Sequence, residues 1–125
     1  MNQGGADDLD AVFAALANPY RRRIVELLAL QPASIQQLAR QLGLSLTAIH
    51  RHIHVLEDAA LVRRKKSGRV NFLAIRRGAL QLLQHWAQPF HSYWGSDEDS
   101  LDNYVDSISR ADRPNASQPP KEHKG

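Results

Sequence analysis

The sequence predicts a mainly α-helical domain that carries one small β-hairpin. Apolar residues recur every three to four positions through residues 9–60 and again from residue 80, which is the spacing of amphipathic helices. Between these stretches, two β-prone runs flank a short turn, which is the pattern of a hairpin. With 125 residues and 42% hydrophobic content, the chain fits one small domain with tails. We expect residues 7–108 to form this domain, and residues 1–6 and 109–125 to be disordered.

The first two predicted helices lie on either side of Asn18-Pro19. Asp7 can cap the first helix, whose apolar stripe is Leu9, Val12, Phe13 and Leu16. Asn18 caps the second helix, and Pro19 takes its first position, where a missing amide costs nothing. The side chains expected to be buried in this second helix are Tyr20, Ile24, Leu27 and Leu28.

Three consecutive arginines, residues 21–23, occupy the first turn of the second helix. The positive end of the helix dipole disfavours cations there. An ion pair of Glu26 with Arg22 or Arg23 would compensate, and so would a bound phosphate. The sequence leaves both alternatives open.

Residues 34–60 read as a helix, a tight turn and a longer helix, entered through a short loop at residues 31–33. Ser34 and Gln37 have the spacing of a capping box. Gly43 stops the first helix because glycine takes the left-handed conformation without a steric penalty, and Ser45 caps the second. An ordinary helical hairpin in a bundle is the alternative reading of this pattern.

The longer helix separates into two faces. The inner face holds Ala48, Ile49, His52, Ile53, Leu56, Ala59 and Ala60. The outer face holds Thr47, His50, Arg51 and His54. Hydroxyl, imidazole and guanidinium groups can meet base edges, and a short preceding helix that crosses at a turn is typical of helix-turn-helix units. The pattern therefore predicts a helix that enters a DNA groove.

Two β-prone runs, residues 61–66 and 69–75, flank Ser67-Gly68 and predict a hairpin that must lie against the helices. Three cations surround its tip: Lys65, Lys66 and Arg69. Such charges can simply prevent edge-to-edge pairing of strands. Directly after a groove-reading helix, however, they predict a wing that follows the phosphates or enters the minor groove.

The last part of the chain predicts more helix than a small core can cover. Apolar positions in residues 76–94 are Leu80, Leu83, Trp86, Ala87, Phe90, Tyr93 and Trp94, with Pro89 implying a kink or restart. Gly95 ends this helix and Ser96 caps another that starts with three acids. Its stripe is Leu101, Tyr104, Val105 and Ile108. The surplus apolar surface predicts a subunit interface, and a cofactor pocket lined by the tryptophans is the alternative.

Charge is concentrated in the middle of the chain. Between Asn18 and Arg77 there are twelve Lys or Arg residues against three acids, whereas the flanking segments are acidic or nearly neutral. A basic centre favours a polyanion-binding face over simple solvated charge.

Several kinds of chemistry are not expected. The chain has no cysteine, no Gly-x-Ser-x-Gly turn, no glycine-rich phosphate loop and no convergent carboxylate pair, so we expect no enzyme. His85 and His91 are six residues apart and cannot share a metal on a regular helix, and the histidines at 50, 52 and 54 point in different directions, so we expect no metal and no cofactor. No signal peptide or apolar run of about 18 residues is present, which favours a soluble cytoplasmic protein.

This order of elements resembles a winged helix-turn-helix regulator of the ArsR family. The resemblance is carried by residues 9–28, 38–62, the RRKKSGR wing and the WAQPFHSYW segment, and it covers residues 9–108. It implies a homodimer built through the first and last helices, which binds a palindromic double-stranded DNA operator and usually represses. The implied interface residues are Leu9, Val12, Phe13, Trp86, Phe90 and Trp94.

The same resemblance places the DNA contacts. They fall on Ser45, Leu46, Thr47, His50, Arg51, His54, Lys65, Lys66 and Arg69. Leu46 stands where the family often has glutamine, and His50 where it often has a small polar residue, so the resemblance does not carry over a preferred DNA sequence; leucine can contact a thymine methyl. The family's metal sensors use cysteines before the turn or paired ligands on the last helix. This sequence resembles the metal-independent members, whose inducer it leaves open.

These sequence features are compatible with three functions. The leading one is a homodimeric, metal-independent, DNA-binding repressor. A winged-helix module that binds an acidic protein partner and ignores duplex DNA is the second, and a metal-responsive repressor of the same family is the third.

Overall fold

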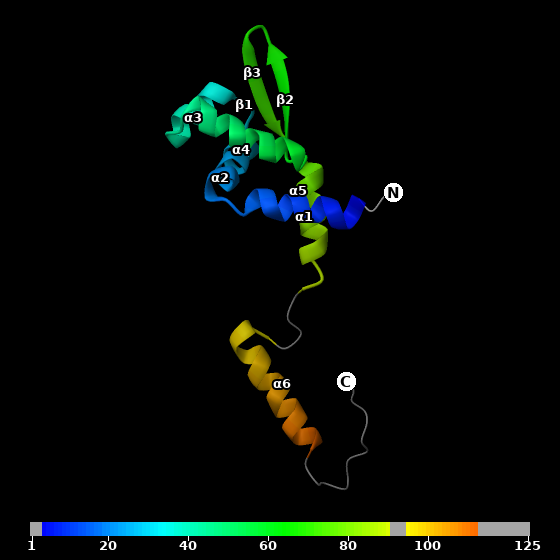
Figure 1. Cartoon of the computed structure of the whole chain (residues 1–125). Helices are drawn as coiled ribbons and strands as arrows, with labels where there is room; N and C mark the ends of the chain where they lie inside the picture. Colours follow the sequence, from blue (N-terminus) through cyan, green and yellow to red (C-terminus); the bar gives the residue numbers. More distant parts are fainter. Residues whose placement is uncertain (1–3, 91–94, 113–125) are drawn as a thin grey trace. The chain divides into compact units, whose positions relative to one another are not determined.

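The computed structural model describes residues 4–90 and 95–112, and the chain divides into two compact units after Gln88. Within the described residues there are six helices and a three-stranded antiparallel sheet, so the predicted fold class is confirmed. In the first unit, Figure 1 shows α1 (Gly4–Leu16) lying across α5 (Arg77–Ala87). The hairpin of β2 (Val62–Ser67) and β3 (Val70–Ile75) extends away from the helices.

Helix α1 spans Gly4–Leu16 and α2 spans Pro19–Leu30. The helix begins at Gly4, so the prediction that Asp7 caps it is wrong; Asp7 lies inside the helix, in the part where the dipole favours acids. Asn18 caps α2 as predicted, because its side-chain oxygen accepts from the Arg21 amide at 3.1 Å. Tyr20 is 45% exposed instead of buried.

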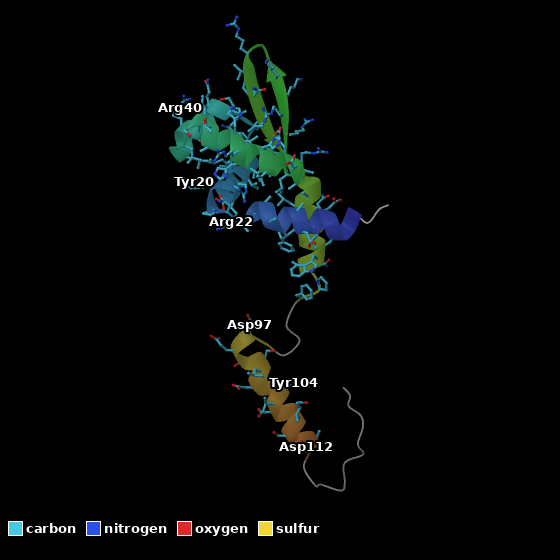
Figure 2. All side chains as sticks on the ribbon, in the orientation of Figure 1. Tyr20, Arg22, Arg40, Asp97, Tyr104 and Asp112 are labelled. Carbon is cyan, nitrogen blue, oxygen red and sulfur yellow. The ribbon has the colours of Figure 1, made fainter. Side chains whose placement is uncertain are left out.

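Two of the three arginines of α2, Arg21 and Arg22, donate hydrogen bonds to backbone carbonyls of α1. Arg21 donates from Nε to the carbonyl of Ala15 at 2.6 Å, and Arg22, which is labelled in Figure 2, donates from Nη1 to that of Leu16 at 2.8 Å. The carbonyl end of α1 carries the negative end of its dipole, so it compensates the unfavourable position of these cations on α2. Arg23 takes the other predicted route, a 3.3 Å ion pair with Glu26.

Strand β1 (Ala33–Ser34), α3 (Ile35–Leu42) and α4 (Leu46–Asp58) follow. The capping box is present: the Gln37 amide donates to Ser34 Oγ at 3.1 Å, and the Ser34 amide donates to Gln37 Oε1 at 2.8 Å. Gly43 has the expected left-handed conformation with φ 66°, and Ser45 accepts from the Ala48 amide at 3.1 Å. The helix-turn-helix and its caps are therefore confirmed. The predicted loop at residues 31–33 is partly wrong, because Ala33 is in a strand.

The end of α4 differs from the prediction. Ala60 is exposed and has φ 59°, although it was expected on the buried face. Leu61 donates its amide to the Leu56 carbonyl and Ala60 donates to that of Glu57, both at 2.9 Å, which is a Schellman ending. Such an ending needs a left-handed residue and usually has glycine, and here alanine occupies it.

We predict that Ala60→Gly stabilises the protein. The left-handed conformation costs an alanine roughly 1–2 kcal/mol, which exceeds the roughly 0.4–1 kcal/mol of extra chain entropy that glycine loses on folding. Denaturant unfolding at fixed protein concentration should show a higher midpoint with an unchanged slope. The matched control is Ala59→Gly, because Ala59 is buried with φ −87°; it should destabilise, and a gain there as large as at position 60 would contradict the explanation.

The hairpin consists of β2 (Val62–Ser67) and β3 (Val70–Ile75), and the strand order is β1-β3-β2. Ser67 pairs with Val70, so the turn is Gly68-Arg69, one residue later than predicted. Gly68 has φ 61° at the first central position, where type II′ turns place glycine. Strand β1 adds to the other edge of β3 through the pairs Ala33–Leu73 and Ser34–Phe72.

One core holds the first unit together. Its residues with 0% exposure are Val12, Ile24, Leu38, Ile49, Ile53, Leu56 and Leu61. Helix α5 (Arg77–Ala87) closes it, and Phe13 on α1 meets Trp86 on α5 edge to face with ring centroids 5.3 Å apart. Helix α5 ends at Ala87, two residues before Pro89, which agrees with the predicted interruption near Pro89; proline has no amide hydrogen with which to continue a helix. Residues 91–94 lie outside the described residues.

In the second unit, α6 spans Asp97–Ala111 and begins as predicted. Ser96 accepts from the Asp99 amide at 3.2 Å, and three acids occupy the first turn (Figure 2). The predicted apolar stripe, Leu101, Tyr104, Val105 and Ile108, is 42–66% exposed. None of the helices in the described ranges is long and apolar enough to cross a membrane.

Candidate nucleic-acid interface

The outer face of α4 is held in place by its inner face. Ile49, Ile53 and Leu56 are completely buried, so they fix the rotation of the helix about its axis. The predicted contact residues on this element are all exposed: Ser45, Leu46, Thr47, His50, Arg51 and His54. Ser45 also caps the helix, and His54 lies 3.9 Å from Asp58.

The wing lies next to this helix. Lys65 and Lys66 on β2 and Arg69 in the turn are exposed, as predicted for phosphate-seeking cations. Arg64, just before them, makes two hydrogen bonds to the Glu57 carboxylate at the end of α4, at 3.0 and 2.9 Å. A direct polar contact therefore joins α4 to the wing.

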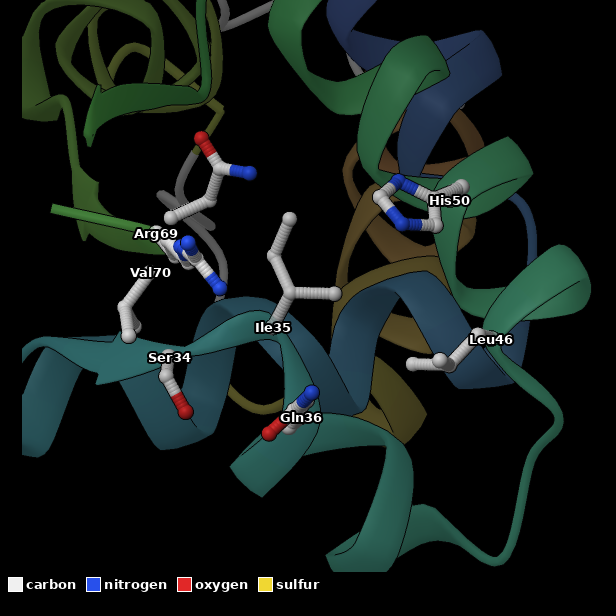
Figure 3. Close-up of a pocket in the computed structure, with 8 residues that line it drawn as sticks. Ser34, Ile35, Gln36, Leu46, His50, Arg69 and Val70 are labelled. Carbon is white, nitrogen blue, oxygen red and sulfur yellow. The ribbon is translucent and has the colours of Figure 1, made fainter.

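A small open cavity of about 110 Å³ lies between α3, α4 and the wing turn. Its lining residues are Ser34, Ile35, Gln36, Leu46, His50, Arg69, Val70 and Asn71. In Figure 3, Leu46 and His50 lie on one side and Arg69 and Val70 on the other, with Ile35 between them. The structure thus brings together three predicted contact residues from two separate elements.

Gln36 and Asn71 line the same cavity and were not predicted as site residues. Gln36 lies in the first turn of α3 beside the capping box, and Asn71 is the second residue of β3. Only the polar character of these positions could have indicated them, because their proximity to His50 depends on how α3 and the hairpin pack.

His52 lies on the inner side of α4, as predicted, and is half-buried. Its ring stacks on Tyr20 with centroids 5.7 Å apart, and its Nδ1 lies 3.4 Å from Nη1 of Arg21. Burial, followed by the nearby guanidinium, holds the pKa of His52 below its usual 6.5. His52 therefore packs α4 against α2 in its neutral form.

We predict that His52 makes stability depend on pH. Because the unfolded chain binds the proton at a higher pH than the folded one, the stability that His52 contributes is complete above about pH 6.5 and is lost as the pH falls below it. Between about pH 7.5 and pH 5.5, the stability of His52→Gln measured by thermal unfolding should therefore fall less than that of the wild type.

His50→Gln is the matched control for this experiment, since it removes an exposed imidazole from the same helix. It should keep the pH dependence of the wild type. An unchanged pH dependence in His52→Gln would contradict the assignment.

The predicted interface residues have different environments. Phe13, Trp86 and Phe90 are 39%, 49% and 67% exposed, and Leu9 is half-buried. Val12 is completely buried within this chain, so it has no surface to offer a second copy, and we remove it from the predicted interface. Trp94 lies outside the described residues.

No group of three or more His, Asp or Glu side chains within the described ranges is arranged to hold a metal ion. His91, one of the two histidines considered from the sequence, lies outside these ranges.

Comparisons with known proteins agree with this architecture. Residues 16–65 match a helix-turn-helix domain model. The regulator YuzN of Bacillus subtilis, named as an uncharacterized HTH-type transcriptional regulator, is 33% identical over 87 residues, which cover 63% of this chain and 95% of YuzN. MJ0229 of Methanocaldococcus jannaschii, which bears the same description, is 46% identical over 48 residues, 38% of this chain and only half of the relative's length.

The crystal structure of an ArsR family transcriptional regulator, RHA00566, matches with a TM-score of 0.64 and 33% identity over 67% of this chain and 87% of that one. The fold places this chain in the class of winged helix-turn-helix domains found in transcriptional regulators. The chain belongs to the ArsR family. Its relatives are named as regulators and not as enzymes.

Proposed function

We propose that this regulator is a homodimeric repressor that binds double-stranded DNA with the outer face of α4 and the wing. The observation that carries the proposal is the cavity that Leu46 and His50 share with Arg69. One polyanionic ligand can meet both elements there, because the helix and the wing open toward the same space.

We assign each predicted contact residue a role in DNA binding. Arg51, His50 and His54 offer hydrogen-bonding groups to base edges in the major groove, and the hydroxyls of Ser45 and Thr47 fix the register. Leu46 contacts a thymine methyl. Lys65, Lys66 and Arg69 attract phosphates whatever the sequence, which provides most of the salt-dependent affinity.

Dimerisation is proposed through the exposed aromatic surface of the terminal elements. Phe13, Trp86 and Leu9 of the first unit would contribute to it, and Phe90 and Trp94, which follow the first unit in the chain, remain predicted interface residues. A symmetric pair presents two copies of α4, so the operator would be palindromic with half-sites about 10 bp apart. Repression follows if the bound dimer occludes a promoter, and it needs no metal.

Selection of bound duplexes from a random pool at near-physiological salt tests the proposal. We expect an inverted repeat, and light scattering should give the mass of two chains for the free protein. Binding in the presence of a chelator should be unchanged. A protein that stays a single chain and enriches no duplex would overturn the proposal, and binding to an acidic polypeptide instead would favour the protein-interaction module.

A further inference from the structure

The pair formed by Glu57 and Arg64 connects the last turn of α4 to β2. Arg64 donates from Nε to Oε2 at 3.0 Å and from Nη2 to Oε1 at 2.9 Å, so one edge of the guanidinium binds both carboxylate oxygens. The side chains are 24% and 31% exposed, whereas those of the Arg23–Glu26 pair are 57% and 63% exposed. This contact is therefore the better shielded of the two.

An acid is unexpected at position 57 for two reasons. The carboxylate lies at the C-terminal end of α4, where the helix dipole disfavours anions. It also lies next to a surface that is proposed to meet phosphates, which a negative charge repels. Both effects oppose Glu57, so its presence calls for a contribution other than net charge.

The position of Arg64 on the hairpin suggests that contribution. Val62 at the base of β2 is buried, and alternation along the strand puts Arg64 on the same face, between Val62 and Lys66. Strand β1 holds the β3 edge of the hairpin, whereas Arg64 lies on β2, at the opposite edge of the sheet. A two-point contact midway along β2 restricts both the distance and the direction of the hairpin relative to α4.

We propose that Glu57 and Arg64 are positioning residues that set the angle of the wing relative to α4. They hold the wing cations and the outer face of α4 so that one duplex meets both at once. The inference rests on the proposed DNA binding, and it assigns to Glu57 a favourable effect that its charge alone would make unfavourable.

Glu57→Gln should change the affinity for DNA in opposite directions, depending on whether Glu57 acts only as a charge or positions the wing. If Glu57 acted only as a charge, its removal would tighten DNA binding. If it positions the wing, binding of the selected duplex should weaken roughly tenfold, within the range for coupled neighbouring residues. The matched control is Asp58→Asn, which removes the next acid along α4, 72% exposed and 3.9 Å from His54, and should not weaken binding.

Two further variants change Arg64, the partner of Glu57. Arg64→Lys keeps the charge but loses the planar fork, so it should weaken binding as Glu57→Gln does. The charge-swapped double variant Glu57→Arg with Arg64→Glu keeps the net charge and should restore most of the lost affinity. Thermal unfolding of every variant confirms that the fold is retained.

A measurement on the free protein separates this inference from the proposed function. Residual dipolar couplings of the hairpin amides should fit one orientation together with α4 in wild type and in Asp58→Asn, and should depart from it in Glu57→Gln. Such a departure supports the positioning role even if no duplex binds, in which case only the proposed function fails. Unchanged couplings, or Glu57→Gln binding as tightly as Asp58→Asn, would overturn the inference.

Discussion

Replacing Ile53 with alanine should cost about 2–5 kcal/mol of folding free energy, the largest effect we expect from any single substitution described here. Ile53 has 0% exposure in the middle of α4, directly behind the face that carries the predicted contact residues. Truncation leaves a cavity that a tightly packed interior fills only in part. Most of the stability of a domain this small would be lost, and DNA binding with it.

Denaturant unfolding measures this effect, at one fixed protein concentration because dimerisation would couple stability to concentration. Ile53→Val should lose only about 0.5–1.5 kcal/mol, since it removes a single methylene. The neighbouring control, His54→Ala, changes an exposed residue and should stay within about 0.5 kcal/mol of wild type. Equal losses at positions 53 and 54 would mean that α4 is rotated from the orientation described here.

Local features of this fold could be predicted from the sequence because they depend on a few neighbouring residues. The capping box of Ser34 and Gln37, the left-handed turn at Gly43 and the cap at Ser45 each satisfy backbone groups within three or four positions. The two faces of α4 follow from helical periodicity in the same way. These elements place most of the predicted contact residues.

Features that depend on distant partners could not be predicted. Strand β1 has only two residues and exists because Ala33 and Ser34 pair with β3, almost forty positions further along. Arg21 and Arg22 are satisfied by carbonyls of α1, which no spacing within α2 indicates. The burial of Val12 likewise depends on how the helices pack, which is why its apolar character suggested an interface.

The same distinction between local and distant interactions applies to the candidate site. The exposed side chains of α4 and the cations of the wing follow from pattern and charge. Their convergence on one cavity, with Gln36 and Asn71 beside them, depends on the packing of the hairpin against α3 and α4. The Glu57–Arg64 contact is of this second kind, since the two residues lie seven positions apart on different elements.

Arg51→Ala should weaken binding to the selected operator by about 1–3 kcal/mol, which is roughly a fivefold to 150-fold loss of affinity. Arg51 projects from the outer face of α4, where a guanidinium can donate two hydrogen bonds to one guanine. Losing them should relax the sequence preference at one position of each half-site, while binding to unrelated duplexes changes much less. Competition binding with substituted operators measures both effects.

The wing lysines should behave in the opposite way. Lys65→Ala or Lys66→Ala removes a cation that we propose to contact phosphates, so binding to all duplexes should weaken by a similar factor. The slope of log affinity against log salt should become shallower by about one for each protomer.

Equal salt slopes in wild type and the wing variants would contradict phosphate contact by the wing. An unchanged selected sequence in Arg51→Ala would contradict base reading by α4. The two results are independent, because the first tests attraction to the backbone and the second tests discrimination among bases.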